Sequence, residues 1–179
     1  MLLKPEVLHE KAEELVRECR TRDALRIARM IGIYVSYRDN FGELPGLYTR
    51  MNGERHIILN SRMEPVVMQM TCAHEIGHDC FHRELIDTCD FFSEYSRSRL
   101  CDEAEYEANA FAAHLLIDDG ELDEALNGGA DNIVSLAAAL NVSVSLMLIK
   151  LHEAERMGRR IRLPHLPRAD FMGRVARRR

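Results

Sequence analysis

The segment His74-Glu75-Ile76-Gly77-His78 constrains this chain more than any other, because it sets two imidazoles four residues apart with a carboxylate between them. On an α-helix, residues four apart project from one face, so both rings can reach the same ion. The spacing H-E-x-x-H is typical of zinc sites in which the glutamate acts on a bound water. It predicts a helix that carries two metal ligands, His74 and His78, and a catalytic base, Glu75. The competing interpretation is a chance match on an ordinary polar helix.

A third ligand is expected on a second helix, since a hydrolytic zinc site has three protein ligands and one open position. The acidic run at residues 103–109 can supply it. Glu105 and Asn109 share one helical face, so Glu105 can bind the ion while Asn109 supports a ligand from behind. Glu107 is rotated away by about 200° and is the reserve candidate. His82 has drifted off the metal-facing side of its helix and is the less favoured ligand.

The chemistry that these residues predict is hydrolysis. Zinc would lower the pKa of a bound water from about 15.7 toward roughly 7. Glu75 would take the proton and pass it to the leaving amine, while the ion and one further donor stabilise the oxyanion. Manganese or iron can replace zinc at a site of two histidines and one carboxylate, but zinc is the first choice. The motif therefore predicts a zinc metallopeptidase.

Hydrophobic periodicity predicts an α+β fold that is mainly helical. Predicted helices cover residues 5–19, 23–31, 65–81, 99–117, 121–126, 133–140 and 143–157, with an irregular connection over 83–98. Three short segments alternate as strands do, at 33–37, 47–50 and 56–59, and Asn52-Gly53 indicates a hairpin between the last two. Small residues such as Ala104 and Ala108 on the 99–117 helix would let it approach its neighbour closely enough to share a metal.

Composition favours a globular protein of one main domain. The chain has 179 residues, of which 46% are hydrophobic and 30% charged, and no apolar run approaches the length of a membrane span. The first residues lack the apolar core of a secretory signal, so we expect a cytoplasmic protein without a membrane partner. Five cysteines, an odd number with no C-x-x-C pair, argue against a disulfide framework and a cysteine zinc ribbon. The sequence leaves the oligomeric state open.

Charge is unevenly distributed along the chain. The net charge is −5, yet residues 156–179 contain nine arginines and one aspartate, which is +8 and leaves −13 for the rest. A basic tail can bind nucleic acid, but many basic termini are simply solvated ends. We interpret residues 158–179 as a solvated basic tail.

The motifs HEIGHDCFH and EYEANAFAAHLL together resemble the ImmA/IrrE family of metallopeptidases. The likeness extends to ARMIGIYVSYRDNFGELPGLYTR and HIILNS upstream and to SLAAALNVSVSLMLIKL downstream, so it covers most of residues 20–155. It implies a mainly helical zincin-like core with the small sheet over residues 1–130. A helix-turn-helix-like helical segment over residues 131–157 would pack on that core, followed by the tail.

The same resemblance implies roles and a substrate. It makes His74, His78 and Glu105 the zinc ligands and Glu75 the base, in agreement with the helical argument. It also implies that the substrate is a helix-turn-helix transcriptional repressor, whose cleavage or inactivation releases genes of mobile elements or of a stress response. The chain departs from the family where Met-Pro commonly follows the Leu-Leu pair, since it continues as Leu115-Leu-Ile-Asp-Asp119, and we expect the loop bordering the cleft to differ there.

Three rival functions remain open. A DNA-binding regulator is suggested by helix-turn-helix spacing over residues 136–146, although the second helix offers only Lys150 for phosphate. A metal-binding sensor without hydrolysis is the second rival, and Glu75 argues against it because a structural site needs no base. An aminopeptidase acting on small peptides is the third, but no amine-binding motif is evident.

Overall fold

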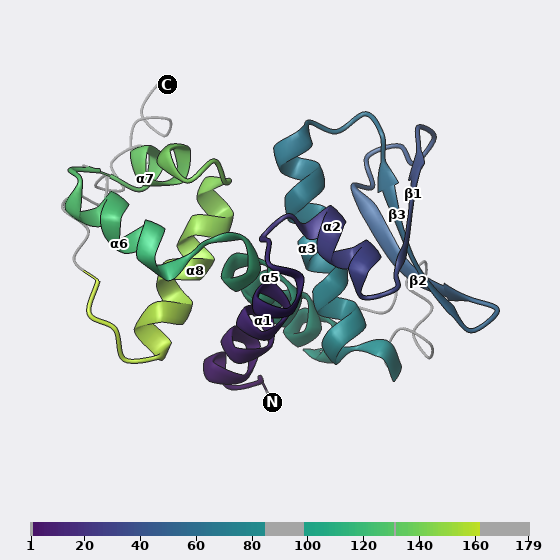
Figure 1. The fold of residues 1–179 in the computed structure, drawn as a ribbon, viewed down its shortest axis with the longest axis horizontal. Coiled ribbons are helices and arrows are strands. Elements are labelled where there is room, and N and C mark those ends of the chain that lie inside the picture. Colours follow the sequence, from purple (N-terminus) through teal and green to yellow (C-terminus); the bar gives the residue numbers. More distant parts are fainter. Residues whose placement is uncertain (1, 85–98, 131, 162–179) are drawn as a thin grey trace, which may run out of the picture.

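The computed structural model describes residues 2–84, 99–130 and 132–161, and over these ranges the chain has the predicted α+β fold (Figure 1). The helices are α1 (Pro5–Cys19), α2 (Ala24–Met30), α3 (Pro65–Phe81), α5 (Arg99–Leu116), α6 (Asp119–Asn127), α7 (Ile133–Ala139) and α8 (Val144–Arg156). The strands are β1 (Tyr34–Arg38), β2 (Gly46–Met51) and β3 (Glu54–Asn60). Each predicted helix and strand is present, with ends that differ by one or two residues.

The sheet has the order β1-β3-β2, with β1 parallel and β2 antiparallel to β3. The predicted hairpin is confirmed, because Asn52 and Gly53 join β2 to β3 with φ angles of 54° and 83°. Two successive positive φ values are the signature of the two-residue hairpin turn for which Asn-Gly is the preferred sequence. This topology leaves β2 at an edge of the sheet, where one side of its backbone pairs with no other strand of the described ranges.

Helix α3 is the central layer of the half of the molecule that contains the sheet. It packs against β2 and β3 on one side and against α5 on the other, with α2 beside it (Figure 1). On its far side α5 contacts α1 and α8. Pro65 begins α3, as its fixed φ and missing N–H favour. The histidine-bearing helix is therefore held between the sheet and the helix that carries the acidic run.

The approach of α3 to α5 depends on small residues, as predicted. A Cβ atom built on Gly77 would lie 3.0 Å from the Cα of Ala108 and 3.2 Å from Cδ1 of Phe111. Ala104 and Ala108 are themselves buried in this contact region. Because Gly77 has no side chain and Ala108 has only a methyl group, the two backbones come close enough there for side chains of both helices to meet at one point.

The C-terminal pair α7 and α8 is bent by 101° at its connection, in keeping with the helix-turn-helix-like segment expected there. Asn132 caps α7 and Ser143 caps α8 through side-chain oxygens that accept backbone N–H groups. Buried residues of this pair, including Leu136 and Met147, belong to the same hydrophobic cluster as Leu8 and Phe111. The boundary between residues 130 and 131 stays a prediction.

Two predictions fall on residues outside the described ranges: the connection from 85 to 98, and the basic tail from 162 onward. Within the described residues, no single helix has both the length and the apolarity to cross a membrane, and only the bent pair α7 and α8, taken together, meets those criteria.

Candidate metal centre and catalytic cleft

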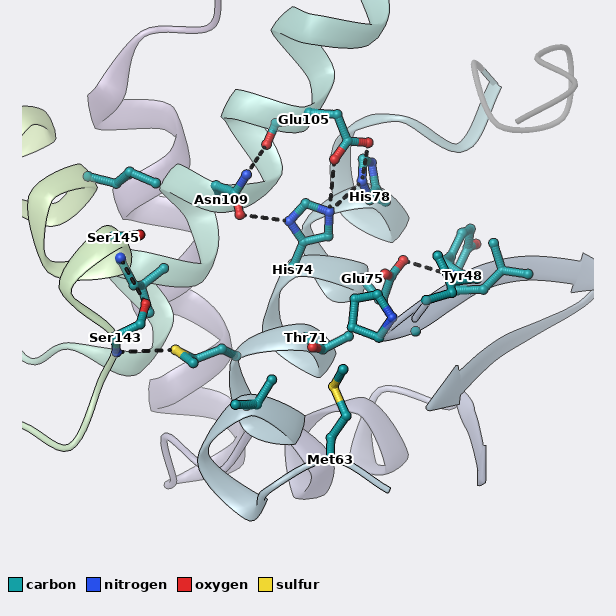
Figure 2. A pocket seen from close by; sticks show the side chains of 18 residues that line it. Tyr48, Met63, Thr71, His74, Glu75, His78, Glu105, Asn109, Ser143 and Ser145 are labelled. Carbon is teal, nitrogen blue, oxygen red and sulfur yellow. Dashed lines mark hydrogen bonds and ion pairs between the residues drawn. The ribbon is translucent and has the colours of Figure 1, made fainter. Parts of the chain in front are cut away.

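Three side chains from α3 and α5 converge on one point. The Nε2 atoms of His74 and His78 lie 3.0 Å apart, and each lies 3.3 Å from a carboxylate oxygen of Glu105. Figure 2 shows the three groups facing one another across the gap between the helices. His78 is buried, His74 half-buried and Glu105 exposed, so the group is enclosed on one side and open on the other. The structure thus brings together the three residues that the sequence nominated as ligands.

The proton positions on His74 follow from its neighbour Asn109. The amide nitrogen of Asn109 donates to the backbone oxygen of Glu105 at 2.8 Å, so its Oδ1 is the atom that faces His74. That oxygen can only accept, and it lies 3.0 Å from Nδ1 of His74. In a neutral imidazole a protonated Nδ1 leaves a lone pair on Nε2. His74 therefore presents an unprotonated nitrogen to the shared point, with Asn109 in the supporting position expected of it.

The donor set fits a cation. Two imidazole nitrogens and a carboxylate are all acceptors, and acceptors 3.0 to 3.3 Å apart repel one another unless positive charge lies between them. The two neighbouring histidines also hold the pKa of Glu105 well below its ordinary value, so this side chain is a carboxylate at neutral pH. Two histidines, one carboxylate and an exposed side form the arrangement typical of a hydrolytic zinc site. Among the described residues, neither Cys72 nor Cys80 joins this group.

Glu75 lies beside the convergent point but makes a contact of its own. Its Oε2 accepts a hydrogen bond of 2.8 Å from the backbone N–H of Tyr48 on β2 (Figure 2). Burial raises the pKa of Glu75 to about 7, against the opposing effects of His74 and of the Tyr48 N–H. A carboxyl group with a pKa near neutrality can both accept and return a proton, which is what a general base that later acts as an acid must do.

Tyr48 was not foreseen from sequence, because a backbone donor has no side-chain signature. It is fixed by its hydroxyl, which donates to Asp79 of α3 at 2.7 Å. Asp79 is buried and also accepts from Arg55 at 2.8 Å and Arg83 at 2.9 Å. These bonds tie the edge strand to the last turns of α3. Their effect is to hold the N–H of Tyr48 against Glu75.

His82 and Glu107 lie outside the convergent group, as the sequence analysis favoured. His82 sits at the end of α3, with its Nδ1 3.2 Å from Nδ1 of His78 and its Nε2 2.9 Å from Oε2 of Glu107. Both residues are buried. The ring of His82 thus contacts the side of His78 that faces away from Glu105. Spacing alone could not show this second association, because it depends on where α5 places Glu107.

The convergent group opens into a cleft with a volume of about 830 Å³. One wall is β2 and the loop before it, and the floor is α3. The opposite wall is the beginning of α8, with Ser143, Ser145, Leu146 and Ile149 (Figure 2). Most of the lining is apolar, contributed by Leu44, Leu47, Met63, Val67, Met70, Leu146 and Ile149. The cleft is therefore suited to a peptide segment with bulky apolar side chains.

The structure corrects one expectation about this cleft. Residues 115–119, which depart from the family pattern, do not line it. Asp118 instead caps α6 by accepting from the N–H groups of Gly120 and Glu121, and Arg22 donates to it at 2.7 Å. The expectation that these residues border the cleft was wrong, because they form the end of α5 and the beginning of α6.

Comparisons with known proteins agree with this picture. The model of the peptidase family Peptidase_M78, described as the IrrE N-terminal-like domain, matches residues 28–152. A protein of Bacillus phage phi105, named uncharacterized immunity region protein 2, is 28% identical over 107 residues. That alignment covers 60% of this chain and 66% of the phage protein, slightly less than two thirds of the latter.

Proposed function

The chain belongs to the Peptidase_M78 family of IrrE N-terminal-like domains, and from this premise we propose that it is a zinc-dependent endopeptidase that cleaves a helix-turn-helix transcriptional repressor. The observation that carries the proposal is the convergence of His74, His78 and Glu105 with Glu75 beside them at the cleft. A structural zinc site has no need of an acidic group at this position or of an open cleft.

In the proposed reaction, His74, His78 and Glu105 would hold the ion, and manganese or iron would suit the same ligands. When bound, the metal supplies an activated water and polarises the carbonyl group to be attacked. Asn109 keeps Nε2 of His74 free of a proton, through the hydrogen bond described above. The protein's contribution at this stage is to fix the ligand atoms and leave one side open to the cleft.

Glu75 would then act as the base. The Tyr48 N–H holds one of its carboxylate oxygens, which fixes the orientation of the group. The carboxylate takes a proton from the attacking water and delivers it to the nitrogen of the leaving amine as the peptide bond breaks. Its burial excludes bulk solvent from this exchange.

The identity of the substrate is supported by family and by chemistry. The similar phage protein is named for an immunity region, which supports a partner that belongs to a repressor system. The apolar cleft suits a segment of another protein that carries large apolar side chains, and an extended backbone can pair with the edge strand β2 beside Glu75. Cleavage would release genes of a mobile element or of a stress response. A repressor substrate places the reaction in the cytoplasm.

The alternative is a metal-binding sensor or DNA-binding regulator that acts without hydrolysis. A DNA-binding regulator of this kind would have to insert α8 into a groove of the DNA. Its first residues line the cleft instead, and Lys150, its one candidate phosphate contact in the sequence analysis, is 0% exposed. These observations favour a peptidase over a regulator that recognises DNA through α8.

The test is to incubate the zinc-loaded full chain with the helix-turn-helix repressor encoded beside its gene and to follow the repressor by mass spectrometry. Two fragments from wild type, and none from Glu75→Gln with the same zinc content, would support the peptidase. Tight binding of intact repressor, equal for both proteins, would instead support the sensor. A shift of operator DNA by the chain alone would support the DNA-binding regulator.

A further inference from the structure

The two histidines of the candidate metal centre receive support of different kinds. His74 is held by the neutral amide of Asn109, whereas Nδ1 of His78 faces the imidazole of His82 at 3.2 Å. Behind His82, its Nε2 lies 2.9 Å from Oε2 of Glu107. Oε1 of the same glutamate accepts the backbone N–H of Leu3 at 2.6 Å. A continuous chain of contacts therefore runs from the convergent point through His78, His82 and Glu107 to the segment before α1.

The direction of the hydrogen bonds along this chain follows from its last member. A carboxylate has no proton to give, so Nε2 of His82 must be the donor toward Glu107. A neutral imidazole that is protonated on Nε2 has an acceptor on Nδ1. Nδ1 of His78 must then donate to His82, which leaves Nε2 of His78 with a lone pair. Glu107 thereby determines that His78 faces Glu105 with an unprotonated nitrogen.

The surroundings keep this arrangement in place. His82 is 7% exposed and Glu107 6% exposed, so water competes little for their hydrogen bonds. The Leu3 N–H occupies one oxygen of Glu107 and leaves the other for His82. Neither residue reaches the convergent point, since the ring of His78 lies between them and it.

We propose that His82 and Glu107 form a positioning relay that fixes the proton position and the ring orientation of His78 for metal binding. The proposal rests on the proposed metal site and deepens it. Outer partners of this kind typically change metal affinity about 10- to 100-fold when they are removed. His82 and Glu107 are thus positioning residues that act through His78, and the supporting set of the metal centre extends to the N-terminal segment.

Glu107→Gln is the sharpest variant, because it keeps the shape of the side chain but has one acceptor and one donor group. Two donors face position 107, the Leu3 N–H and Nε2–H of His82. The amide cannot satisfy both. If its NH₂ group faces His82, the proton of that ring moves to Nδ1, and His78 must then carry its own proton on Nε2, toward the metal.

A pair of substitutions at position 82 separates proton placement from mere packing. His82→Asn retains an acceptor oxygen near the position of Nδ1, whereas His82→Leu retains bulk without any acceptor. The matched controls are His152→Gln and Glu10→Gln, since both of these residues are exposed and lie outside the relay.

The experiment measures Zn²⁺ affinity of the full chain by competition with a chromophoric chelator, together with the visible absorption spectrum of the Co²⁺-loaded protein. We expect Glu107→Gln and His82→Leu to bind Zn²⁺ about 10- to 100-fold more weakly than wild type and to show altered Co²⁺ bands. His82→Asn should regain most of the affinity, and the two controls should match wild type. The circular dichroism of each metal-free variant checks that it is folded.

Two results would overturn the inference, and they are distinguishable. If wild type binds Zn²⁺ and folded Glu107→Gln and His82→Leu bind it within about twofold of wild type, the relay fails while the proposed function stands. If wild type itself binds no Zn²⁺, both fail together. Equal loss of affinity in His82→Asn and His82→Leu would also count against the relay, because an acceptor at that position would then make no difference.

Discussion

Two clusters of histidine and carboxylate side chains lie on α5 and its neighbours, one open to the cleft and one buried between α5 and α8. The open cluster contains His74, His78 and Glu105. The buried cluster contains His114, Lys150 and Glu153, each 0% exposed. Both combine imidazoles with carboxylates from several helices, yet only the first has the properties of a metal site.

The two clusters differ in the position of their hydrogen-bond donors. In the buried cluster the ammonium group of Lys150 lies 2.8 Å from Oδ1 of Asp119, and Glu153 accepts from Arg156 and Tyr106 at 2.6 Å each. Protein cations already neutralise these carboxylates. In the open cluster the donors, such as Nδ1 of His74, point outward and leave acceptors facing inward. Convergent acceptors bind a cation, whereas acceptors paired with lysine and arginine hold helices together.

The largest effect is expected at the base of the open cluster. Glu75→Gln should lower the rate of repressor cleavage about 1000-fold, because general acid–base catalysis is typically worth about 100- to 10,000-fold. Zinc content should stay equal to that of wild type, since Glu75 is not one of the converging ligands. Single-turnover cleavage and elemental analysis measure the two quantities. Cleavage by Glu75→Gln at the wild-type rate would show that Glu75 is not the catalytic base.

The next largest effect concerns the ligand on α5. Glu105→Ala should weaken Zn²⁺ binding by more than the roughly 10- to 100-fold typical for loss of an outer partner, because a charged ligand is lost. The measurement is chelator competition, with Glu124→Ala, an exposed carboxylate on α6, as the control. Unchanged affinity in Glu105→Ala would show that another group completes the site.

In the buried cluster, the substitution Glu153→Gln should lower the stability of the fold and leave Zn²⁺ affinity unchanged. Glu153→Gln removes the charge that accepts from Arg156 and Tyr106 and should lower the free energy of unfolding by about 3 kcal/mol, as breaking a buried pair typically does. Urea denaturation measures this change. Zinc affinity should equal that of wild type, and a loss of metal would contradict the separation of the two clusters.

Glu153 should also make the free energy of unfolding depend on pH in the acidic range. Burial alone would raise the pKa of Glu153, but the nearby imidazole of His114 and hydrogen bonds from Tyr106 and Arg156 outweigh it and lower the pKa from 4.5 to about 2. Because the pKa is lower in the folded state, the unfolded state binds more protons between these values. The stabilisation is therefore complete above about pH 4.5 and is lost as the pH falls toward 2. Wild type should lose more stability than Glu153→Gln over this window, as followed by denaturation at successive pH values.

The smallest effect is expected for Lys150→Met. Burial lowers the pKa of Lys150, which shows that its charge is held at a cost in solvation. Removal of one partner of a buried ion pair is costly when the other charge is left unpaired, but Asp119 is partly exposed and retains Arg159 at 3.1 Å. We expect a change in unfolding free energy within about 1 kcal/mol. A loss comparable to that of Glu153→Gln would mean that the lysine, and not the arginine, holds the cluster together.

Much of the site followed from local pattern. The spacing of His74 and His78 puts both on one face of α3, and the choice of Glu105 over Glu107 followed from rotation along α5. The Asn52-Gly53 turn fixed the hairpin. Each of these inferences concerns residues within one helix or turn, where the geometry is set by backbone dihedral angles and hydrogen bonds between near neighbours.

Other features depended on packing between distant segments. The N–H of Tyr48 reaches Glu75 because Asp79 and Gly46 bring β2 against α3, where a Cβ on Gly46 would lie 2.6 Å from Thr71. Lys150 resembled a phosphate contact in the sequence but is buried against Asp119.

The sequence by itself determined the helices and strands, the faces on which the metal-binding candidates lie, and the family likeness that the comparisons bear out. Only the tertiary structure decided which donors meet which acceptors: His82 with Glu107, Tyr48 with Glu75, and α8 with the cleft. The physical reason is that local sequence patterns report on neighbouring residues only. Periodicity specifies the direction of a side chain relative to its own helix, while the distance between two helices depends on every side chain packed between them, such as Gly77 against Ala108.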